Sequence, residues 1–368
     1  EVNDAMVVNY AQLRLIEDQL AARTWLAVIL DEAQYIKNPD SQTAQAARAL
    51  PALHRLALTG TPIENRLLDL WSILAFAMPG ALGSRAQFNK SFSKDDPLAR
   101  RRLAARLRPF LLRRTKGQVA QDLPDRIEED VLCELEGTQK ALYSAEYKKA
   151  RALLLGLKTS ADLDKFRFHF LTSLLRLRQI CCHAALVDPK HRRQPSAKLD
   201  ALIDLVEPLL SQGLKVLVFS QFTYMLDILK ETLEAKGATT FLLTGETENR
   251  GPLVDSFNQH EGAAAFLISL KAGGFGLNLT SASYVVLFDP WWNPAVENQA
   301  IDRTHRIGQK NTVFAYRLIV QGSIEEKIRQ LQSSKSALAQ DILGEERFSQ
   351  SLTLDDFRFL FESPEAPV

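Results

Sequence analysis

The chain has 368 residues, of which 46% are hydrophobic and 24% are charged, and its formal net charge is +1. This composition is typical of a globular protein with two or three domains. No apolar run approaches the length needed to cross a membrane, and the first residues lack the pattern of a signal peptide. Three cysteines in a chain of this length indicate a reducing compartment. Because the chain opens without methionine, we expect it to be a piece of a longer protein.

Two carboxylates follow the first apolar run. Residues 26–30 read Leu-Ala-Val-Ile-Leu, which predicts a buried parallel strand, and Asp31 and Glu32 come directly after it. Ligands of open α/β sheets bind beyond the carboxyl ends of the strands. One of these carboxylates can hold Mg²⁺, usually through water, and the other can deprotonate an attacking water. A solvated pair at a strand end is the alternative.

A second strand end follows. Residues 56–58 form a short apolar run that leads into Thr59, Gly60 and Thr61. Hydroxyls and a glycine at this position predict a tight turn that senses a nucleotide or a neighbouring loop. Residues 63–78 are then apolar at helical spacing, which predicts a helix.

Residues 100–116 form a basic stretch with eight arginines and lysines and no acidic residue. Phe110, Leu111 and Leu112 interrupt the charges. This interruption favours a packed element with a basic side, suited to a polyanion, over a plain solvated face.

The rest of the chain alternates between helices and strands. Two long helices are predicted at about 138–157 and 160–184, and the polar residues 188–195 predict a linker. Adjacent Cys181 and Cys182 are interpreted as packed thiols rather than a metal site, because no second pair lies at zinc spacing.

A second α/β block with a parallel sheet then follows. Its predicted strands are residues 216–219, 241–243, 266–268, 285–288 and 313–319, and its first helix runs from Ser196 to Gly213. Ser323 and Glu326 predict a capping box for a helix to about Leu343, and residues 352–362 predict a short docking helix.

A helix with two arginines follows the strand at 285–288. Asn293 suits the N-cap and Pro294 the first helical position. Gln299, Arg303 and Arg306 then fall at i, i+4 and i+7, which predicts one helical face. Guanidiniums suit a phosphate whose charge is changing, and a basic surface helix is the alternative. Two α/β blocks with these strand ends indicate a nucleotide held between two lobes. The Gly-Lys pair of the phosphate-binding loop is absent from the printed sequence.

Together these motifs resemble the Swi/Snf family of helicase-like ATPases, a prokaryotic-type branch of the superfamily-two DNA translocases. The resemblance covers essentially the whole chain, but only the part of the ATPase core downstream of the phosphate-binding (Walker A) loop. The matching segments are Asp31–Gln34 (motif II), Leu58–Pro62 (motif III), Val216–Phe222 (motif IV), Ser269–Thr280 (motif V), Asp289–Pro294 (the tryptophan segment) and Gln299–Gln309 (motif VI). Ala184 stands where the family usually has a proline.

The resemblance implies two RecA-like lobes with parallel sheets and helical protrusions, the first lobe being truncated at its N-terminus. The expected divisions are residues 1–83 for the remainder of lobe 1, 84–135 for its protrusion and a basic crossover, 136–195 for the protrusion of lobe 2 and a linker, 196–320 for lobe 2, and 321–368 for a bracing helix and tail.

The resemblance also implies roles for the motif residues. Asp31 would bind Mg²⁺ together with ATP, Glu32 would act as the base, and Arg303 and Arg306 would stabilise the transferring phosphate. Gln34, Gly276 and Gln299 would contact the nucleotide, and Thr59, Gly60 and Thr61 would couple nucleotide state to DNA. The expected DNA contacts are Ser220, Gln221, Thr247, Arg250, Ser269, Lys271, Thr280, Trp291 and Trp292.

The expected function is ATP-dependent movement along double-stranded DNA with displacement of DNA-bound proteins. We expect a monomer without membrane contact, in the cytoplasm on the nucleoid or, in a eukaryote, in the nucleus. Two alternatives stay open. The chain as printed is an inactive DNA- or partner-binding module, because the Walker A loop is missing, or it belongs to a strand-separating helicase.

Overall fold

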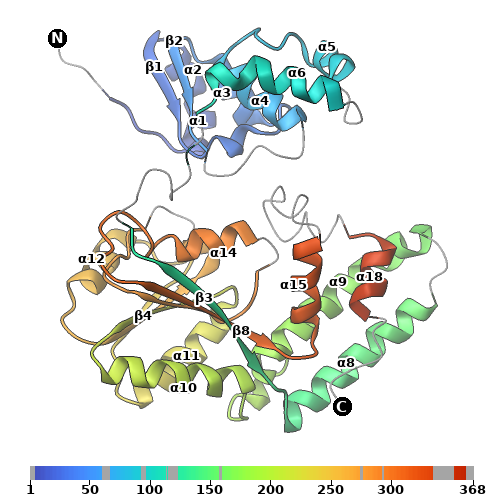
Figure 1. Cartoon of the computed structure of the whole chain (residues 1–368), viewed down its shortest axis with the longest axis vertical. Helices are drawn as coiled ribbons and strands as arrows, with labels where there is room; N and C mark the ends of the chain where they lie inside the picture. The colour runs from blue at the N-terminus through green and yellow to red at the C-terminus, as the bar shows by residue number, and fades with distance from the viewer. Residues whose placement is uncertain are drawn as a thin grey trace. The chain divides into compact units, whose positions relative to one another are not determined.

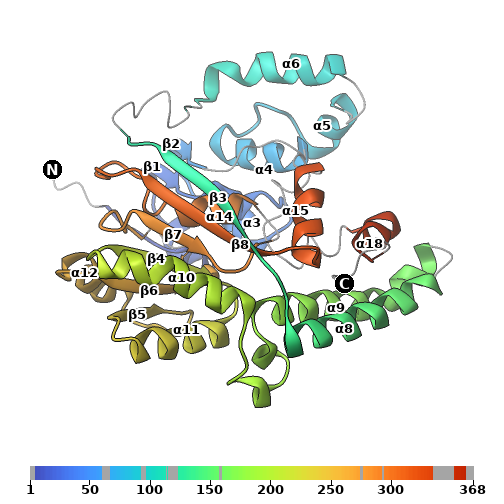
Figure 2. The same cartoon turned by 60° about the horizontal axis from the view of Figure 1, so that its bottom comes forward.

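The computed structural model describes residues 5–59, 67–92, 97–112, 114, 123–156, 160–273, 277–291, 294–334 and 352–361. The chain divides into two compact units, Glu1–Thr115 and Lys116–Val368 (Figures 1 and 2). Each unit has hydrophobic cores of its own. No helix among the described residues is long and apolar enough to cross a membrane. The boundary falls inside the predicted segment 84–135, and the five predicted divisions stay predictions.

The first unit contains a two-stranded parallel sheet. Strand β1 (Trp25–Leu30) pairs with β2 (Ala52–Ala57) in register from Trp25↔Ala52 to Leu30↔Ala57. The helices of this unit are α1 (Tyr10–Leu15), α2 (Glu17–Ala21), α3 (Gln42–Ala49), α4 (Leu67–Ala77), α5 (Arg85–Ser91) and α6 (Pro97–Leu107). Asn9 and Ser84 begin α1 and α5 with capping boxes, each closed by a glutamine three residues later.

The prediction that residues 26–30 form a parallel strand is confirmed, but the prediction that this strand is buried is wrong. Leu26 is 69% exposed and Ile29 is 58% exposed, and only Leu30 is buried. A strand becomes buried on both faces when helices cover them and strands flank it on both edges. Among the residues that the structure describes, β1 has one neighbouring strand, and this accounts for the exposure.

The basic stretch at 100–116 also differs from its prediction. Phe110 is 65% exposed and Leu112 is 82% exposed, so these residues do not pack the segment onto a core. Helix α6 instead buries Ala99, Leu103 and Leu107, which recur at intervals of four. Arg101, Arg102 and Arg106 of this helix and Arg108 just after it are exposed.

The second unit is built on a six-stranded sheet, in which every pair of strands is parallel, with the order β3-β8-β7-β4-β6-β5. The strands are β3 (Arg126–Cys133), β4 (Lys215–Ser220), β5 (Thr240–Leu243), β6 (Ala264–Ser269), β7 (Tyr284–Leu287) and β8 (Val313–Val320). All five strands predicted for this block are confirmed to within a few residues. Strand β3 was not predicted, and it forms an edge of the sheet beside β8.

Helices cover both faces of this sheet (Figure 2). Alternate residues of a strand point to opposite faces. Val216 and Val218 of β4 accordingly pack in one core with α10 (Ala197–Ser211) and α11 (Thr223–Ala235). Leu217 and Phe219 pack in the other. The other face carries α12 (Arg250–Gln259) and α14 (Pro294–Ile301), and the short α13 (Leu270–Gly273) follows β6.

A helical hairpin and two C-terminal helices complete the second unit. Helices α8 (Gly137–Leu155) and α9 (Ser160–Cys182) lie side by side in Figures 1 and 2, as predicted for residues 138–184. Helix α15 (Ile324–Ser334) begins after Ser323, but the predicted capping box is shifted. The Ser323 hydroxyl accepts from the Glu325 N–H, and the Glu326 carboxylate accepts from the Gly322 N–H. The predicted end near Leu343 lies outside the described residues.

The predicted docking helix in the tail is confirmed as α18 (Leu354–Phe361). Its residues Phe357, Leu360 and Phe361 are buried against α8, α9 and α15. The Phe357 ring lies 5.2 Å from Phe170 of α9, measured between ring centroids. The Lys327 ammonium of α15 donates to the Leu360 carbonyl at 3.1 Å.

Phe357→Ala should lower the free energy of unfolding of the second unit by about 3–5 kcal/mol, because the ring is fully buried and its removal leaves a cavity. Phe359→Ala on the same helix is the matched control, since Phe359 is 43% exposed; it should change stability by no more than about 0.5 kcal/mol. Urea unfolding compares the two variants. Equal losses would show that α18 does not contribute to the core in solution.

Candidate functional site

The acidic residues of the first unit lie at the carboxyl end of β1. Asp31 is exposed in the turn after the strand, and Glu32 has φ 52° and ψ 50°. Glu32 is the one non-glycine residue with positive φ among the described residues. This left-handed conformation costs about 1–2 kcal/mol for a residue with a Cβ, and such strain often occurs at functional sites.

A chain of hydrogen bonds joins the two strand ends. The Gln34 amide donates to the Glu32 carboxylate at 2.7 Å, and the Thr59 hydroxyl donates to the Gln34 side-chain oxygen at 2.8 Å. The Ala33 N–H donates to the Leu58 carbonyl at 2.7 Å. The structure therefore brings together Glu32, Gln34 and Thr59.

Tyr10, the first residue of α1, contacts the turn after β1. Its hydroxyl donates to the Asp31 carbonyl at 2.7 Å. Burial, followed by the negative charges of Asp31 and Glu32, raises the pKa of Tyr10 well above its ordinary value. Tyr10 therefore stays a protonated donor, which keeps the backbone of Asp31 in place.

The acidic strand end suits a metal ion that arrives with a phosphate. No group of three or more His, Cys, Asp or Glu residues in the described part of the chain is placed to hold a metal ion. Mg²⁺ commonly binds through one or two carboxylates, waters and substrate phosphates. An exposed Asp31 at a strand end fits this kind of shared coordination.

In the second unit, the strand-end loop (residues 288–291) follows β7. Asp289 in this loop is buried and accepts hydrogen bonds from the Ser220 hydroxyl and the Gln221 N–H, at the end of the neighbouring strand β4. The Trp291 N–H donates to the Glu297 carboxylate of α14 at 2.8 Å. The loop thus connects two adjacent strand ends to the helix that follows.

The predicted shared helical face of Gln299, Arg303 and Arg306 is wrong. Helix α14 ends at Ile301, and the Arg303 and Thr304 N–H groups bond three residues back, in turns. Gln299 is half-buried on the helix, Arg303 is buried, and Arg306 is half-buried beyond it. The Arg306 guanidinium donates to the Asp302 and Leu277 carbonyls at 3.0 and 3.4 Å.

Hydrogen bonds with residues 279–282 hold both ends of the arginine segment (residues 302–309). The Leu279 N–H donates to the Arg303 carbonyl at 3.0 Å. The side-chain amide of Gln309 donates to the Thr280, Ala282 and Thr304 carbonyls. Gly308 has φ +104°, which a residue with a Cβ rarely adopts. Gly308 and Gln309 are therefore explained by the turn that ends the arginine segment.

Comparisons with known proteins decide the family. Residues 2–186 match the SNF2-related domain, and residues 197–308 match the helicase conserved C-terminal domain. The chain belongs to the SNF2 family. Its members are superfamily-two helicase-like ATPases, and the parallel sheets correspond to two RecA-like lobes.

Solved structures and curated relatives agree with this assignment. The Sulfolobus solfataricus SWI2/SNF2 ATPase core in complex with double-stranded DNA is 35% identical with a TM-score of 0.54, over 96% of this chain and 76% of that one. A Mycoplasma pneumoniae protein named as an ATP-dependent helicase is 39% identical over 98% of this chain. A mouse SWI/SNF-related regulator of chromatin, subfamily A member 1, is 36% identical over 88%. The chain spans 35% and 32% of the length of these two proteins.

The residues predicted to contact DNA in this SNF2-family chain lie in different settings. Ser220 and Ser269 are buried, and the Ser220 hydroxyl is bonded to Asp289, which argues against a direct contact in this arrangement. The Gln221 Nε2 and Trp291 Nε1 atoms are buried and have no hydrogen-bond acceptor among the residues that the structure describes. The predicted contacts that are half-buried as residues are Gln221, Thr247, Arg250 and Thr280.

Several predicted site residues lie outside the described residues. These are Gly60, Thr61, Gly276 and Trp292. Lys271 belongs to α13, but its side chain also lies outside the description. The roles predicted for all five stay predictions.

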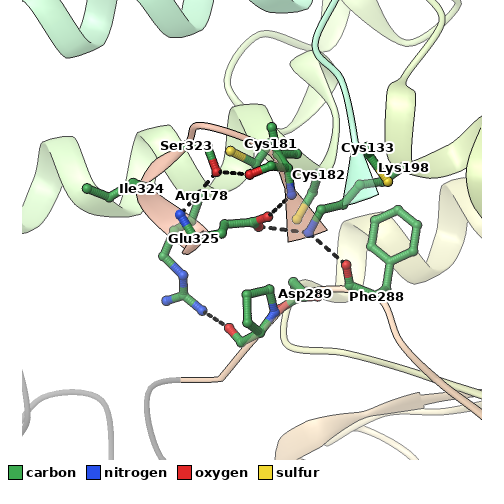
Figure 3. Close-up of polar contacts among 12 residues, drawn as sticks. Cys133, Arg178, Cys181, Cys182, Lys198, Phe288, Asp289, Ser323, Ile324 and Glu325 are labelled. Carbon is green, nitrogen blue, oxygen red and sulfur yellow. Dashed lines mark hydrogen bonds and ion pairs between the residues drawn. The ribbon is translucent and has the colours of Figure 1, made fainter. Parts of the chain in front are cut away.

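A set of buried charged residues behind the strand-end loop was not predicted from the sequence. Lys198 of α10 and Glu325 of α15 form an ion pair at 2.8 Å, and both side chains are fully buried (Figure 3). Glu297 of α14 pairs with Arg317 of β8 at 3.1 Å. The partners come from distant segments, so no local spacing in the sequence indicates them.

The stability of the second unit should depend on the ionisation of Asp289. Burial raises the pKa of Asp289 to about 6, although Ser220, Arg178 and Lys198 act in the opposite direction. A raised pKa means that the folded state favours the protonated form of Asp289. The resulting contribution to the free energy of unfolding is present below pH 4 and is lost as the pH rises through 6. Relative to Asp289→Asn, wild-type unfolding free energy should fall by roughly 2–3 kcal/mol over this interval.

Urea unfolding at several pH values measures this difference. Asp227→Asn, at an exposed position of α11, corrects for the general effect of removing one carboxylate. If the difference in unfolding free energy between wild type and Asp289→Asn stays constant between pH 4 and pH 7, the raised pKa of Asp289 is contradicted.

Proposed function

We propose that these residues are part of an ATP-driven translocase that moves along duplex DNA and displaces proteins bound to it. The hydrogen-bonded chain from Glu32 through Gln34 to Thr59 carries this proposal. It holds a candidate base next to a candidate Mg²⁺ ligand at a strand end. It also connects that base to the second strand end, from which a change in nucleotide state can pass to other parts of the protein.

The residue roles follow from their chemistry. Asp31 is proposed to hold Mg²⁺, which neutralises charge on the ATP phosphates when bound. Glu32 orients the attacking water and takes its proton, with Gln34 fixing the carboxylate by the 2.7 Å bond. Arg303 and Arg306 stabilise the charge of the transferring phosphate, because a guanidinium remains protonated even where it is buried.

Turnover by this scheme also needs a phosphate-binding loop, which the printed residues do not contain. This supports a second candidate function for the 368 residues by themselves, namely a DNA-binding module without ATP turnover. Strand separation is a third candidate. An assay of duplex unwinding beside one of DNA-stimulated ATP hydrolysis distinguishes all three.

Exposed basic side chains support a duplex-DNA partner. The exposed arginines of α6 form a basic side, and Lys148, Lys149 and Lys165 are exposed on the hairpin of α8 and α9. We propose that the protein acts as a monomer wherever the cell keeps its DNA.

Glu32→Gln should lower kcat for DNA-stimulated ATP hydrolysis about 10²- to 10⁴-fold in the full-length protein, because glutamine cannot take a proton. Its DNA affinity should stay within about twofold, since the base does not contact DNA. Glu261→Gln is the matched control, at an exposed position before β6. A Glu32→Gln protein that retains a third of wild-type turnover would refute the role of base.

DNA binding should weaken steeply with salt, and α6 should contribute to this dependence. Each phosphate neutralised changes the slope of log affinity against log salt by about one. Arg102→Ala together with Arg106→Ala should therefore make the slope shallower by about two, whereas the exposed Arg23→Ala should leave it unchanged. Fluorescence anisotropy with a short duplex measures it. If the double variant keeps the wild-type slope, α6 does not bind DNA.

A further inference from the structure

Buried side chains from three helices hold the backbone of the strand-end loop. The Lys198 ammonium of α10 donates to the Phe288 carbonyl at 2.9 Å, and the Arg178 guanidinium of α9 donates to the Pro290 carbonyl at 2.8 Å. The Gln332 amide of α15 donates to the Trp291 carbonyl. All three donors are almost completely buried.

Figure 3 shows Lys198 between Glu325 and the Phe288 carbonyl. Glu325 also accepts from the Val320 N–H at 3.0 Å, so α15 is fixed against the end of β8. The cost of desolvating a buried ion pair often cancels its attraction. Such a pair contributes little net stability compared with apolar residues, but it does define the position of the groups that it joins.

The bond from Gln332 differs from the other two in its place along the chain. It holds the last described residue before α14, whereas Lys198 and Arg178 hold residues nearer to β7. Trp291 is also joined to α14 itself through Glu297, which is paired with Arg317 of β8. A shift of the Trp291 backbone therefore moves the start of α14 and, through it, the arginine segment.

Helix α15 is a rigid base for this contact. Ile324, Ile328 and Leu331 are buried on its inner side and belong to the core of the second unit. Gln332 adds a single neutral donor to that side, so a side chain of similar volume without the donor can replace it while the apolar packing remains.

We propose that Gln332 is a positioning residue, which sets the path of the chain from β7 into α14 and thereby the placement of Arg303 and Arg306. The consequence for turnover rests on the proposed ATPase function, but the structural effect does not. The C-terminal helix α15, which follows the last strand, thus takes part in shaping a site built from earlier segments.

The test uses the full-length protein labelled with 5-fluorotryptophan. Fluorine NMR follows Trp291, whose resonance is assigned from its loss in Trp291→Phe. Gln332→Met removes the donor, and Gln330→Met, at an exposed position of the same helix, is the matched control. Gln332→Met should shift or broaden the Trp291 resonance and lower kcat for ATP hydrolysis about tenfold, with KM for ATP within twofold. Gln330→Met should change neither.

Each outcome decides the proposal. An unchanged Trp291 resonance in Gln332→Met, or a changed resonance with unchanged kcat, would overturn it. If wild-type protein does not hydrolyse ATP, the proposed function fails, and the resonance alone decides whether Gln332 sets the loop. If Gln332→Met folds poorly, Gln332→Leu, which also lacks a donor, should give the same change in the Trp291 resonance, and a wild-type spectrum in Gln332→Leu would overturn the proposal.

Discussion

The buried ion pair between Lys198 and Glu325 connects the main parts of the second unit. Lys198 is on the helix that follows the α8 and α9 hairpin, Glu325 is on the helix that follows the last strand, and the Phe288 carbonyl accepts from the same ammonium. Burial lowers the pKa of Lys198, but Glu325 outweighs this effect and the pKa is raised above its ordinary value. Lys198 therefore stays charged, and its removal would leave Glu325 as an uncompensated charge in the core. Sheet, loop and C-terminal helix depend on each other through this pair.

The strands of the second unit could be predicted because their signal is local. Residues 216–219 and 266–268 are continuous apolar runs, and the structure buries them on both faces. Strand β3 has no such run, since Glu128, Glu129 and Asp130 occupy its centre. It is an edge strand with much of its surface exposed, and Arg317 of the neighbouring strand compensates its charges. Such a strand is defined by its neighbour rather than by its own pattern.

The part of the candidate site that lies at strand ends could also be predicted from local signals in the sequence. Asp31, Glu32, Gln34 and Thr59 are placed by two strand ends, and the structure joins three of them by hydrogen bonds. The path of the chain through Arg303 and Arg306 was not predictable, because helical spacing continues in the sequence after the helix itself has ended at Ile301. The end is decided by contacts with residues 277–282, which are close in space only after folding. Gln332 and Lys198 escaped prediction for the same reason.

The pairing of β3 with β8 has a consequence for the order in which the second unit forms. Arg126 lies beside Val313 and Cys133 beside Val320, so, among the described strands of this unit, the first to be synthesised pairs with the last. Contacts between residues so far apart in the sequence form late, because a long loop must close first. The ribosome therefore releases the acidic strand long before its partner exists. Charged side chains disfavour the pairing of an unpartnered strand edge with other chains, and Glu128, Glu129 and Asp130 place three carboxylates on this strand.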